Sequence, residues 1–259
     1  MKKQIALLTL LLLIMNCFEA TAQFGKIGKA IQAGKDAVQA VTLSDADIVK
    51  ISKEYMVWMD SINKLTKPDS EYGQRLERLT GNIKEVDGLQ VNFGVYEVAD
   101  VNAFACGDGS VRICAGLMDA MTDEELMAVV GHEIGHVIHT DSKDAMKNAY
   151  IRSAVKNAAG IISEKLAKLT ESQLGTIADN LSSAQFSQKQ ENAADDYSVE
   201  FCVKNNIDPY AMSKALIKLE ELSAGAPKVS YLQKMFSSHP DTMKRIERAK
   251  AKADTYPKK

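Results

Sequence analysis

The spacing of apolar residues in the middle of the chain changes from a helical period to a strand period and back. Residues 44–65 and 71–83 predict two helices, which a breaker sequence around Pro68 separates. Apolar side chains then alternate from Val91 to Val95, and this period of two predicts a strand over about 89–98. The pattern therefore predicts helices followed by a sheet.

Two further short strands follow, over residues 102–105 and 111–114. They are joined through Asp108-Gly109, and an Asp-Gly pair between two apolar runs is a strong hairpin signal. We therefore expect a small three-stranded antiparallel sheet directly before the next helix. If residues 102–105 form the edge of that sheet, an extended peptide could add to them as another strand.

Residues 123–138 carry the clearest helical pattern of the chain. Thr122 and Glu125 have the spacing of a capping box, in which each side chain satisfies a backbone N–H of the first turn. The apolar positions at helical spacing, which predict a buried helix, are Leu126, Val129, Val130, Ile134, Val137 and Ile138. Gly131 and Gly135 weaken a helix interior, so we expect another element to pack closely against them.

The segment 143–188 is long, amphipathic and mostly helical in pattern. It either covers a functional site and gates it, or forms a packed pair of helices. Together with the other predicted elements it indicates an α+β fold class in which helices predominate.

Length and composition agree with a globular domain. The chain has 259 residues, of which 46% are hydrophobic and 25% charged, enough for one substantial core. Its formal net charge of −2 gives no sign of nucleic acid as a partner. The oligomeric state has no signal in the sequence.

The N-terminal residues have the pattern of an export signal. Lys2-Lys3 precede an apolar run over 5–15, and Ala20-Thr21-Ala22 has the small residues of a cleavage site. We expect a signal peptide over 1–22, a flexible or helical leader over 23–43, and a single domain over 44–259. This organisation predicts an exported protein.

The cysteines leave two questions open. Cys17 follows the apolar run, so the alternative to simple cleavage is a lipoprotein anchored to a membrane through this residue. Cys106, Cys114 and Cys202 are three in number, so at least one thiol stays unpaired within the chain. They could equally be buried small apolar residues.

The predicted helix contains the sequence His132-Glu133-Ile134-Gly135-His136. Residues four apart share one helix face, so His132 and His136 can direct two imidazoles at one zinc ion, with Zn–N distances of roughly 2.0–2.1 Å. Glu133 can then reach a water that the metal activates, which suits a general base. Buried polar groups such as these are costly unless they find partners, and a metal is such a partner.

A third ligand must come from elsewhere in the chain, because catalytic zinc sites use three protein ligands. Glu191 and Asp195 lie four apart on another predicted helix, so both carboxylates face the same way. Glu191 can bind zinc, whereas Asp195 can accept a hydrogen bond from a ligating histidine and fix its ring. By itself this pair is a weak signal.

The fourth histidine of the chain, His239, lies near the C-terminus. Pro240 holds His239 in an extended or turn conformation just before a helix begins. Near zinc, the imidazole of His239 could stabilise the oxyanion of a tetrahedral intermediate. The alternative is a surface loop that precedes a helix. His139 we interpret as a surface residue or an outer neighbour of the site.

Taken together, these motifs resemble the M48 family of zinc metallopeptidases. The motifs that carry the resemblance are Asn102-Ala103-Phe104-Ala105, Gly131-His132-Glu133-Ile134-Gly135-His136, Glu191 with Asp195, and Ser238-His239-Pro240 through Arg245. The chain is most similar to the soluble exported bacterial branch, which includes outer-membrane and periplasmic lipoprotein peptidases. The likeness extends from about residue 44 to residue 248.

The resemblance implies a zincin-like fold with one Zn²⁺ per chain, held by His132, His136 and Glu191. It implies Glu133 as general base, Asp195 as support for the ligands and His239 as a stabiliser of the transition state. Substrate binding would fall to Asn102, Ala103, Phe104 and Arg245.

The implied activity is a zinc-dependent endopeptidase acting on misfolded or unfolded envelope proteins. The implied partners are polypeptide substrates and, through association, the outer membrane or its assembly machinery. The alternative is a chaperone or assembly factor that uses the same groove without hydrolysis. Intact His132, Glu133 and His136 argue against that alternative, because binding alone gives no reason for a base beside a metal.

Overall fold

The computed structural model describes residues 43–156, 168–224, 239 and 242–257. One compact unit comprises residues 43–153 and 166–259, and a second comprises 1–42 and 154–165. Of the second unit only residues 154–156 are described. The predicted signal peptide and almost all of the predicted leader therefore lie outside the described residues, and the predicted domain boundaries stay predictions.

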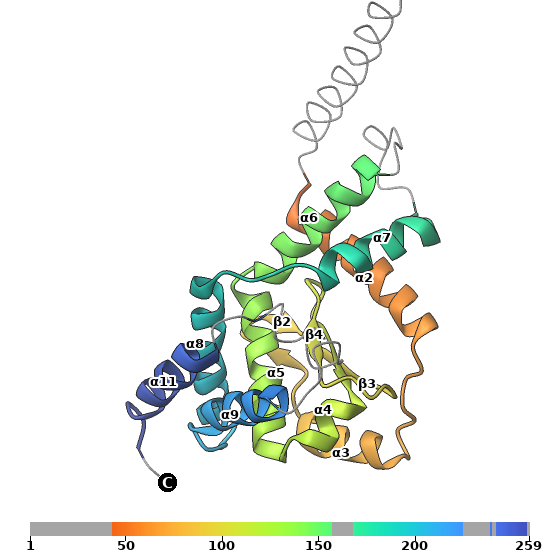
Figure 1. Cartoon of the computed structure of the whole chain (residues 1–259). Helices are drawn as coiled ribbons and strands as arrows, with labels where there is room; N and C mark the ends of the chain where they lie inside the picture. The colour runs from red at the N-terminus through yellow and green to blue at the C-terminus, as the bar shows by residue number, and fades with distance from the viewer. Residues whose placement is uncertain (1–42, 157–167, 225–238, 240–241, 258–259) are drawn as a thin grey trace, which may run out of the picture. The chain divides into compact units, whose positions relative to one another are not determined.

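The fold class is α+β with helices predominating, as the sequence predicts (Figure 1). The helices are α2 (Asp45–Ile62), α3 (Glu71–Thr80), α4 (Ala115–Ala120), α5 (Asp123–Ile138), α6 (Asp141–Lys156), α7 (Glu171–Ser182), α8 (Gln188–Lys204), α9 (Ala211–Ala224) and α11 (Thr242–Ala253). The strands are β1 (Glu85–Val86), β2 (Leu89–Gln90), β3 (Asn92–Tyr96), β4 (Ala103–Ala105) and β5 (Ser110–Cys114). None of the helices in the described ranges is long and apolar enough to cross a bilayer.

The main sheet has three strands in the order β3-β5-β4, and it is mixed rather than antiparallel. β4 and β5 form the predicted antiparallel hairpin, with Gly109 at a φ of +86° in its turn. β3 pairs with β5 in parallel, which corrects the antiparallel prediction. The reason is that β5 lies between the other two strands. β3 and β4 run in opposite directions but do not pair with each other, so β5, which is antiparallel to β4, is parallel to β3. β4 is an edge strand, as strand addition of a peptide would require.

The predicted strand over 89–98 is divided in two. Leu89–Gln90 pairs with Glu85–Val86 in a separate hairpin, and β3 begins only at Asn92. The turn is Asp87-Gly88, with φ values of 48° and 84°. Two successive residues with positive φ match the tight hairpin turn that Asp-Gly favours. The sequence analysis did not use this Asp-Gly pair, because the alternating apolar residues that follow it predicted one continuous strand.

Helix α5 is the centre of the first hydrophobic cluster, with the sheet on one side and α8 on another (Figure 1). Its capping box is present, with Thr122 accepting from the backbone N–H of Glu125 and Glu125 accepting from that of Thr122. Its two glycines face α8, where a Cβ on Gly135 would lie 3.1 Å from the Cα of Ala194. The expected close packing against these glycines is confirmed.

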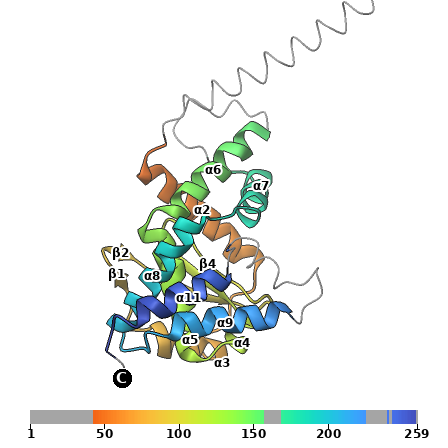
Figure 2. The ribbon, with the colours of Figure 1, turned by 60° about the vertical axis from the view of Figure 1, so that its left-hand side comes forward.

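Two more clusters complete the core. Side chains of α5 and α8 pack against α9 and α11 in one of them, and Figure 2 shows the course of these helices. In the other, α2 packs against α6 and α7, the two helices described between residues 141 and 182. Residues 157–167 of the predicted segment 143–188 lie outside the described residues, and its gating role stays a prediction. Arg112 on β5 fixes α2 to the sheet through two hydrogen bonds to Asp60, at 2.9 and 2.8 Å.

The three described cysteines are buried, and the structure shows no disulfide at any of them. Burial raises the pKa of the Cys202 thiol to about 12, so this side chain stays protonated at neutral pH. The buried apolar interpretation therefore accounts for Cys106, Cys114 and Cys202, and Cys17 lies outside the described residues.

An alanine at position 131 tests the close contact of α5 with α8. A Cβ on Gly131 would lie 2.7 Å from Cδ1 of the buried Phe201 ring. We expect Gly131→Ala to lower the free energy of unfolding by about 1–3 kcal/mol, because a packed core accommodates added atoms poorly.

Gly175 of α7 provides the control, because a Cβ there would meet no atom within 4 Å. Gly175→Ala should instead raise the free energy of unfolding by about 0.5–1 kcal/mol through helix propensity. Urea denaturation measures both, and a Gly131→Ala protein as stable as wild type would contradict the contact.

Candidate metal centre

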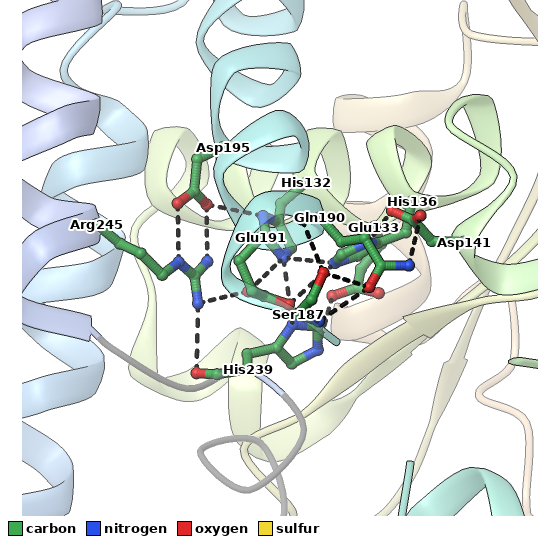
Figure 3. A network of polar contacts seen from close by, with 10 residues as sticks. All are labelled: His132, Glu133, His136, Asp141, Ser187, Gln190, Glu191, Asp195, His239 and Arg245. Carbon is green, nitrogen blue, oxygen red and sulfur yellow. Dashed lines mark hydrogen bonds and ion pairs between the residues drawn. The ribbon is translucent and has the colours of Figure 1, made fainter. Parts of the chain in front are cut away.

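Three separate parts of the fold meet at one buried polar site (Figure 3). Helix α5 provides His132, Glu133 and His136, all buried. Helix α8 provides Glu191, and His239 comes from the segment that precedes α11. The sequence-predicted residues from these three regions therefore lie together.

Four side chains present metal-ligating atoms to a common point. One ligating atom each from His132, His136, Glu191 and His239 lies within 4.8 Å of all the others. The Nε2 atoms of His132 and His136 are 3.1 Å apart, and Nε2 of His136 is 3.4 Å from Oε1 of Glu191. Ligands at roughly 2.0–2.1 Å from a tetrahedral zinc lie about 3.4 Å from one another. The donor set and its spacing therefore fit a metal ion of the zinc type.

Nδ1 of His239 lies 2.8 Å from Oε1 of Glu191 and 3.4 Å from Nε2 of His132. Its other ring nitrogen, Nε2, lies 3.9 Å from Oε1 of Glu133. His239 thus contacts both the ligand cluster and the predicted base.

Burial raises the pKa of Glu191, but the neighbouring His136 and His239 outweigh this and hold the pKa far below its usual range. Glu191 is accordingly a carboxylate at neutral pH.

The Nδ1 side of His132 is held by a carboxylate. Nδ1 lies 2.9 Å from Oδ1 of Asp195, which is itself fully buried. Burial raises the pKa of Asp195, but Arg245 and His132 outweigh this and bring the pKa below its ordinary value. Burial lowers the pKa of His132, which favours the neutral imidazole that a metal requires.

His136 is held in the same way by Asp141, a residue that the sequence analysis did not identify. Nδ1 of His136 lies 3.0 Å from Oδ2 of Asp141. Burial lowers the pKa of His136, but hydrogen bonds with Asp141 and Glu191 outweigh it and raise this pKa to about 9. Asp141 is the first residue of α6, directly after the turn that ends α5, and its position beside a helix end is the signal that could have found it.

The carboxylate of Glu133 is unusual in the site. The side chain is 4% exposed, and its Oε1 has no hydrogen-bond partner among the described residues. Buried polar atoms are nearly always paired, so an unpaired one at a ligand cluster calls for an explanation. A reacting group that enters the site would be such a partner.

A cavity of about 420 Å³ connects Glu133 and His239 with the edge strand β4. Asn102, Ala103 and Phe104 line it, so these predicted substrate-binding residues face the same space as the predicted base. Side chains of α2, α6 and α7 also line it. The edge of the sheet and the ligand cluster therefore open onto one space.

Phe186 is a further residue that sequence reasoning missed. Its ring stacks on the imidazole of His136, with centroids 4.0 Å apart and an angle of 16° between the planes. It also lines the cavity. Its position just before α8 gave no periodic signal in the sequence.

Arg245 lies elsewhere than its predicted substrate-binding role requires. Its side chain is buried, and its guanidinium donates to both oxygens of Asp195, at 2.8 and 2.7 Å. It also pairs with Oε2 of Glu191 at 2.6 Å. Its donors are engaged by Asp195, Glu191 and the backbone of His239, and its side chain does not line the cavity. His139 is exposed at the end of α5, away from the cluster, in agreement with its interpretation as a surface residue.

Comparisons with known proteins match a family model, curated relatives and a solved structure. The model of peptidase family M48 matches residues 69–253, which include every member of the cluster. Metalloprotease LoiP of Escherichia coli (strain K12) is 37% identical over 218 residues, which cover 84% of each chain. Metalloprotease YcaL of the same organism is 37% identical over 219 residues, again 84% of each chain. The crystal structure of S. mikatae Ste24p matches 88% of this chain and 63% of its own, with 16% identity and a TM-score of 0.42.

Replacing Arg245 tests whether it compensates the buried carboxylates. Arg245→Met keeps a long side chain but leaves Asp195 and Glu191 without their cation. We expect the free energy of unfolding of the metal-loaded protein to fall by about 3–5 kcal/mol, the usual cost of breaking a buried ion pair. Arg248→Met on the same helix removes a half-exposed ion pair with Asp196 and should cost less than about 1 kcal/mol. Urea denaturation compares the two, and equal losses would contradict the assigned role.

Proposed function

The chain belongs to peptidase family M48, and we propose that it is a zinc-dependent endopeptidase of unfolded polypeptides. The observation that carries this proposal is the oxygen of Glu133 that has no hydrogen-bond partner among the described residues. It is buried beside three candidate metal ligands, and the side chain lines a cavity that runs along an open sheet edge. A base, a metal and a main-chain recognition edge are what peptide hydrolysis needs at one place.

His132, His136 and Glu191 would hold one Zn²⁺ per chain. Two neutral imidazoles and one carboxylate are a usual ligand set of catalytic zinc in peptidases. When bound, zinc supplies Lewis-acid activation of water and of the scissile carbonyl. Asp195 would keep His132 in the tautomer that leaves Nε2 free for the metal.

Glu133 would act first as a base and then as an acid. Its Oε1 accepts a proton from the attacking water, and the same carboxyl group then returns the proton to the leaving amine. The lack of a competing hydrogen bond at Oε1 keeps this atom available. His239 would donate a hydrogen bond to the oxyanion that forms on the scissile carbonyl, from a position on the cavity wall.

The substrate would bind as an added strand along β4. An edge strand offers unpaired backbone N–H and C=O groups, which an extended peptide can pair with regardless of its sequence. Asn102, Ala103 and Phe104 would make these contacts. This mode selects chain segments that are already unfolded, and this is the physical reason to propose misfolded proteins as substrates.

The cellular setting follows from the predicted signal peptide. Export would place the enzyme in the periplasm, or on a membrane if Cys17 is lipidated, with envelope proteins as substrates. Association with the outer membrane or its assembly machinery belongs to the same proposal.

The second candidate function is a chaperone or assembly factor that binds unfolded chains in the same cavity without cleaving them. The apolar lining and the free edge of β4 would serve that function equally well. What distinguishes the two is whether Glu133 is needed.

Replacing Glu133 by glutamine separates metal binding from hydrolysis. Glu133→Gln keeps the ligands, so we expect one zinc per chain as in wild type, with cleavage of a chemically unfolded protein reduced by a factor of at least about 10³. Zinc is measured by elemental analysis and cleavage by gel electrophoresis, and a chelator should abolish wild-type cleavage. Equal cleavage by both proteins would rule out Glu133 as the base. Absence of cleavage by either, with stoichiometric zinc, would favour the chaperone.

Replacing His239 tests its proposed contact with the oxyanion. We expect His239→Ala to lower kcat by a factor of about 10²–10³ with little change in KM, since the contact strengthens only in the transition state. His139→Ala, at the exposed end of α5, is the matched control and should behave as wild type. A His239→Ala protein with unchanged kcat would exclude the role.

A further inference from the structure

The two histidines of α5 are held from behind by different carboxylates. The His132–Asp195 contact runs between α5 and α8 and is backed by Arg245. The His136–Asp141 contact runs from α5 to the start of α6 and is backed by Gln190 of α8 (Figure 3). The second of these arrangements has no counterpart among the motifs recognised in the sequence.

The contact with Asp141 decides which nitrogen of His136 is free. Nδ1 faces Oδ2 of Asp141 at 3.0 Å, whereas Nε2 faces His132 and Glu191 in the ligand cluster. A carboxylate accepts hydrogen bonds, so it holds the proton on Nδ1 and leaves the lone pair of Nε2 for a metal. With Phe186 stacked on the ring face, both the tautomer and the plane of His136 are restrained.

The backbone adopts an unfavourable conformation where it brings Asp141 to this place. Thr140, which directly precedes Asp141, has a φ of +67°. A β-branched residue rarely adopts a positive φ, and such strain persists only where the surrounding structure enforces it. The turn reverses the chain so that Asp141 lies beside His136, and the side chain of Asp141 is 6% exposed.

Gln190 uses both ends of its amide. Its Oε1 accepts hydrogen bonds from the backbone N–H and the hydroxyl of Ser187, at 2.9 and 2.7 Å, and so completes the capping box of α8. The backbone N–H can only donate, which fixes Oε1 on that side. Nε2 therefore points the other way, and it donates to Oδ1 of Asp141 at 2.8 Å.

A capping box accepts glutamate as readily as glutamine at this position, because only an acceptor is required. A glutamate at position 190 would keep the cap but would place a second carboxylate against Asp141. The donor Nε2 is thus the feature of Gln190 that the helix cap does not explain.

We propose that Asp141 and Gln190 are positioning residues of the metal centre, in which the N-cap of α8 orients His136 through the relay Ser187–Gln190–Asp141. The relay connects α5, which carries His136, with α8, which carries Glu191. Glu191 directly follows Gln190 in the chain. Folding of the α8 N-terminus and assembly of two ligands thereby become one event. This inference rests on the proposed zinc site.

The test uses the isosteric variant Gln190→Glu in the full mature chain, prepared without metal. Zinc affinity is measured by competition with a chromophoric chelator, and the ligand geometry by the visible absorption of the Co²⁺-substituted protein. We expect zinc to bind about 10–100-fold more weakly than in wild type, the usual effect of losing a group that orients a ligand, with an altered cobalt spectrum.

Gln173→Glu is the matched control. Gln173 occupies the same capping-box position in α7, where its Oε1 accepts from the backbone N–H and hydroxyl of Thr170. It lies outside the ligand cluster, so this variant should keep wild-type zinc affinity and a wild-type cobalt spectrum.

The double variant Asp141→Asn/Gln190→Glu provides a rescue. An asparagine at 141 can accept from Nδ1 of His136 with its oxygen and donate to the new glutamate with its nitrogen. The double variant should therefore bind zinc more tightly than Gln190→Glu alone. A loss of helix capping would not produce this recovery, because Asp141→Asn does not change the cap.

Three results would overturn the inference. They are a Gln190→Glu protein with wild-type affinity and spectrum, equal weakening in Gln173→Glu, and no recovery in the double variant. A wild-type protein that binds no zinc would overturn the proposed zinc site together with this inference, so failure of the relay alone remains distinguishable.

Discussion

The close approach of α5 to α8 is the constraint on which the rest of the site depends. Gly131 and Gly135 leave room for Phe201 and for the backbone at Ala194 to lie directly against α5. Only at this separation do His132 and His136, one turn apart on α5, reach the carboxylate of Glu191 from the neighbouring helix. The glycines weaken an isolated helix, but they permit the contact that assembles the ligands.

A buried site of this kind must balance its charges. Glu191 and Asp195 are both fully buried, and Arg245 lies between them as a buried cation. The guanidinium suits this place because it can pair with two carboxylates in fixed directions. A metal cation would complete the balance at the ligand cluster, where Oε1 of Glu133 has no hydrogen-bond partner among the described residues. Electrostatics therefore connects the stability of this region with its chemistry.

The cavity joins that chemistry to the edge of the sheet. β4 is an edge strand because β5 lies between it and β3, and its residues share the cavity with Glu133 and His239. Helices α6 and α7 pack with α2 around the same space. The elements that position the candidate metal ligands and those that would position a substrate thus meet at two residues. Glu133 lies beside His132 in the chain, and Phe186 stacks on the ring of His136.

Sequence reasoning predicts the helical period of α5, its capping box, the hairpin of β4 and β5, and the pairs His132/His136 and Glu191/Asp195. Each of these depends on residues a few positions apart, whose relative placement the backbone geometry of one helix or one turn already fixes. The tertiary structure alone decided the parallel pairing of β3, the burial of Arg245 behind the ligands, and the contacts of Asp141 and Phe186 with His136. Those features depend on the packing of elements that are distant in the chain, or on the direction of a turn. Local periodicity carries no information about either.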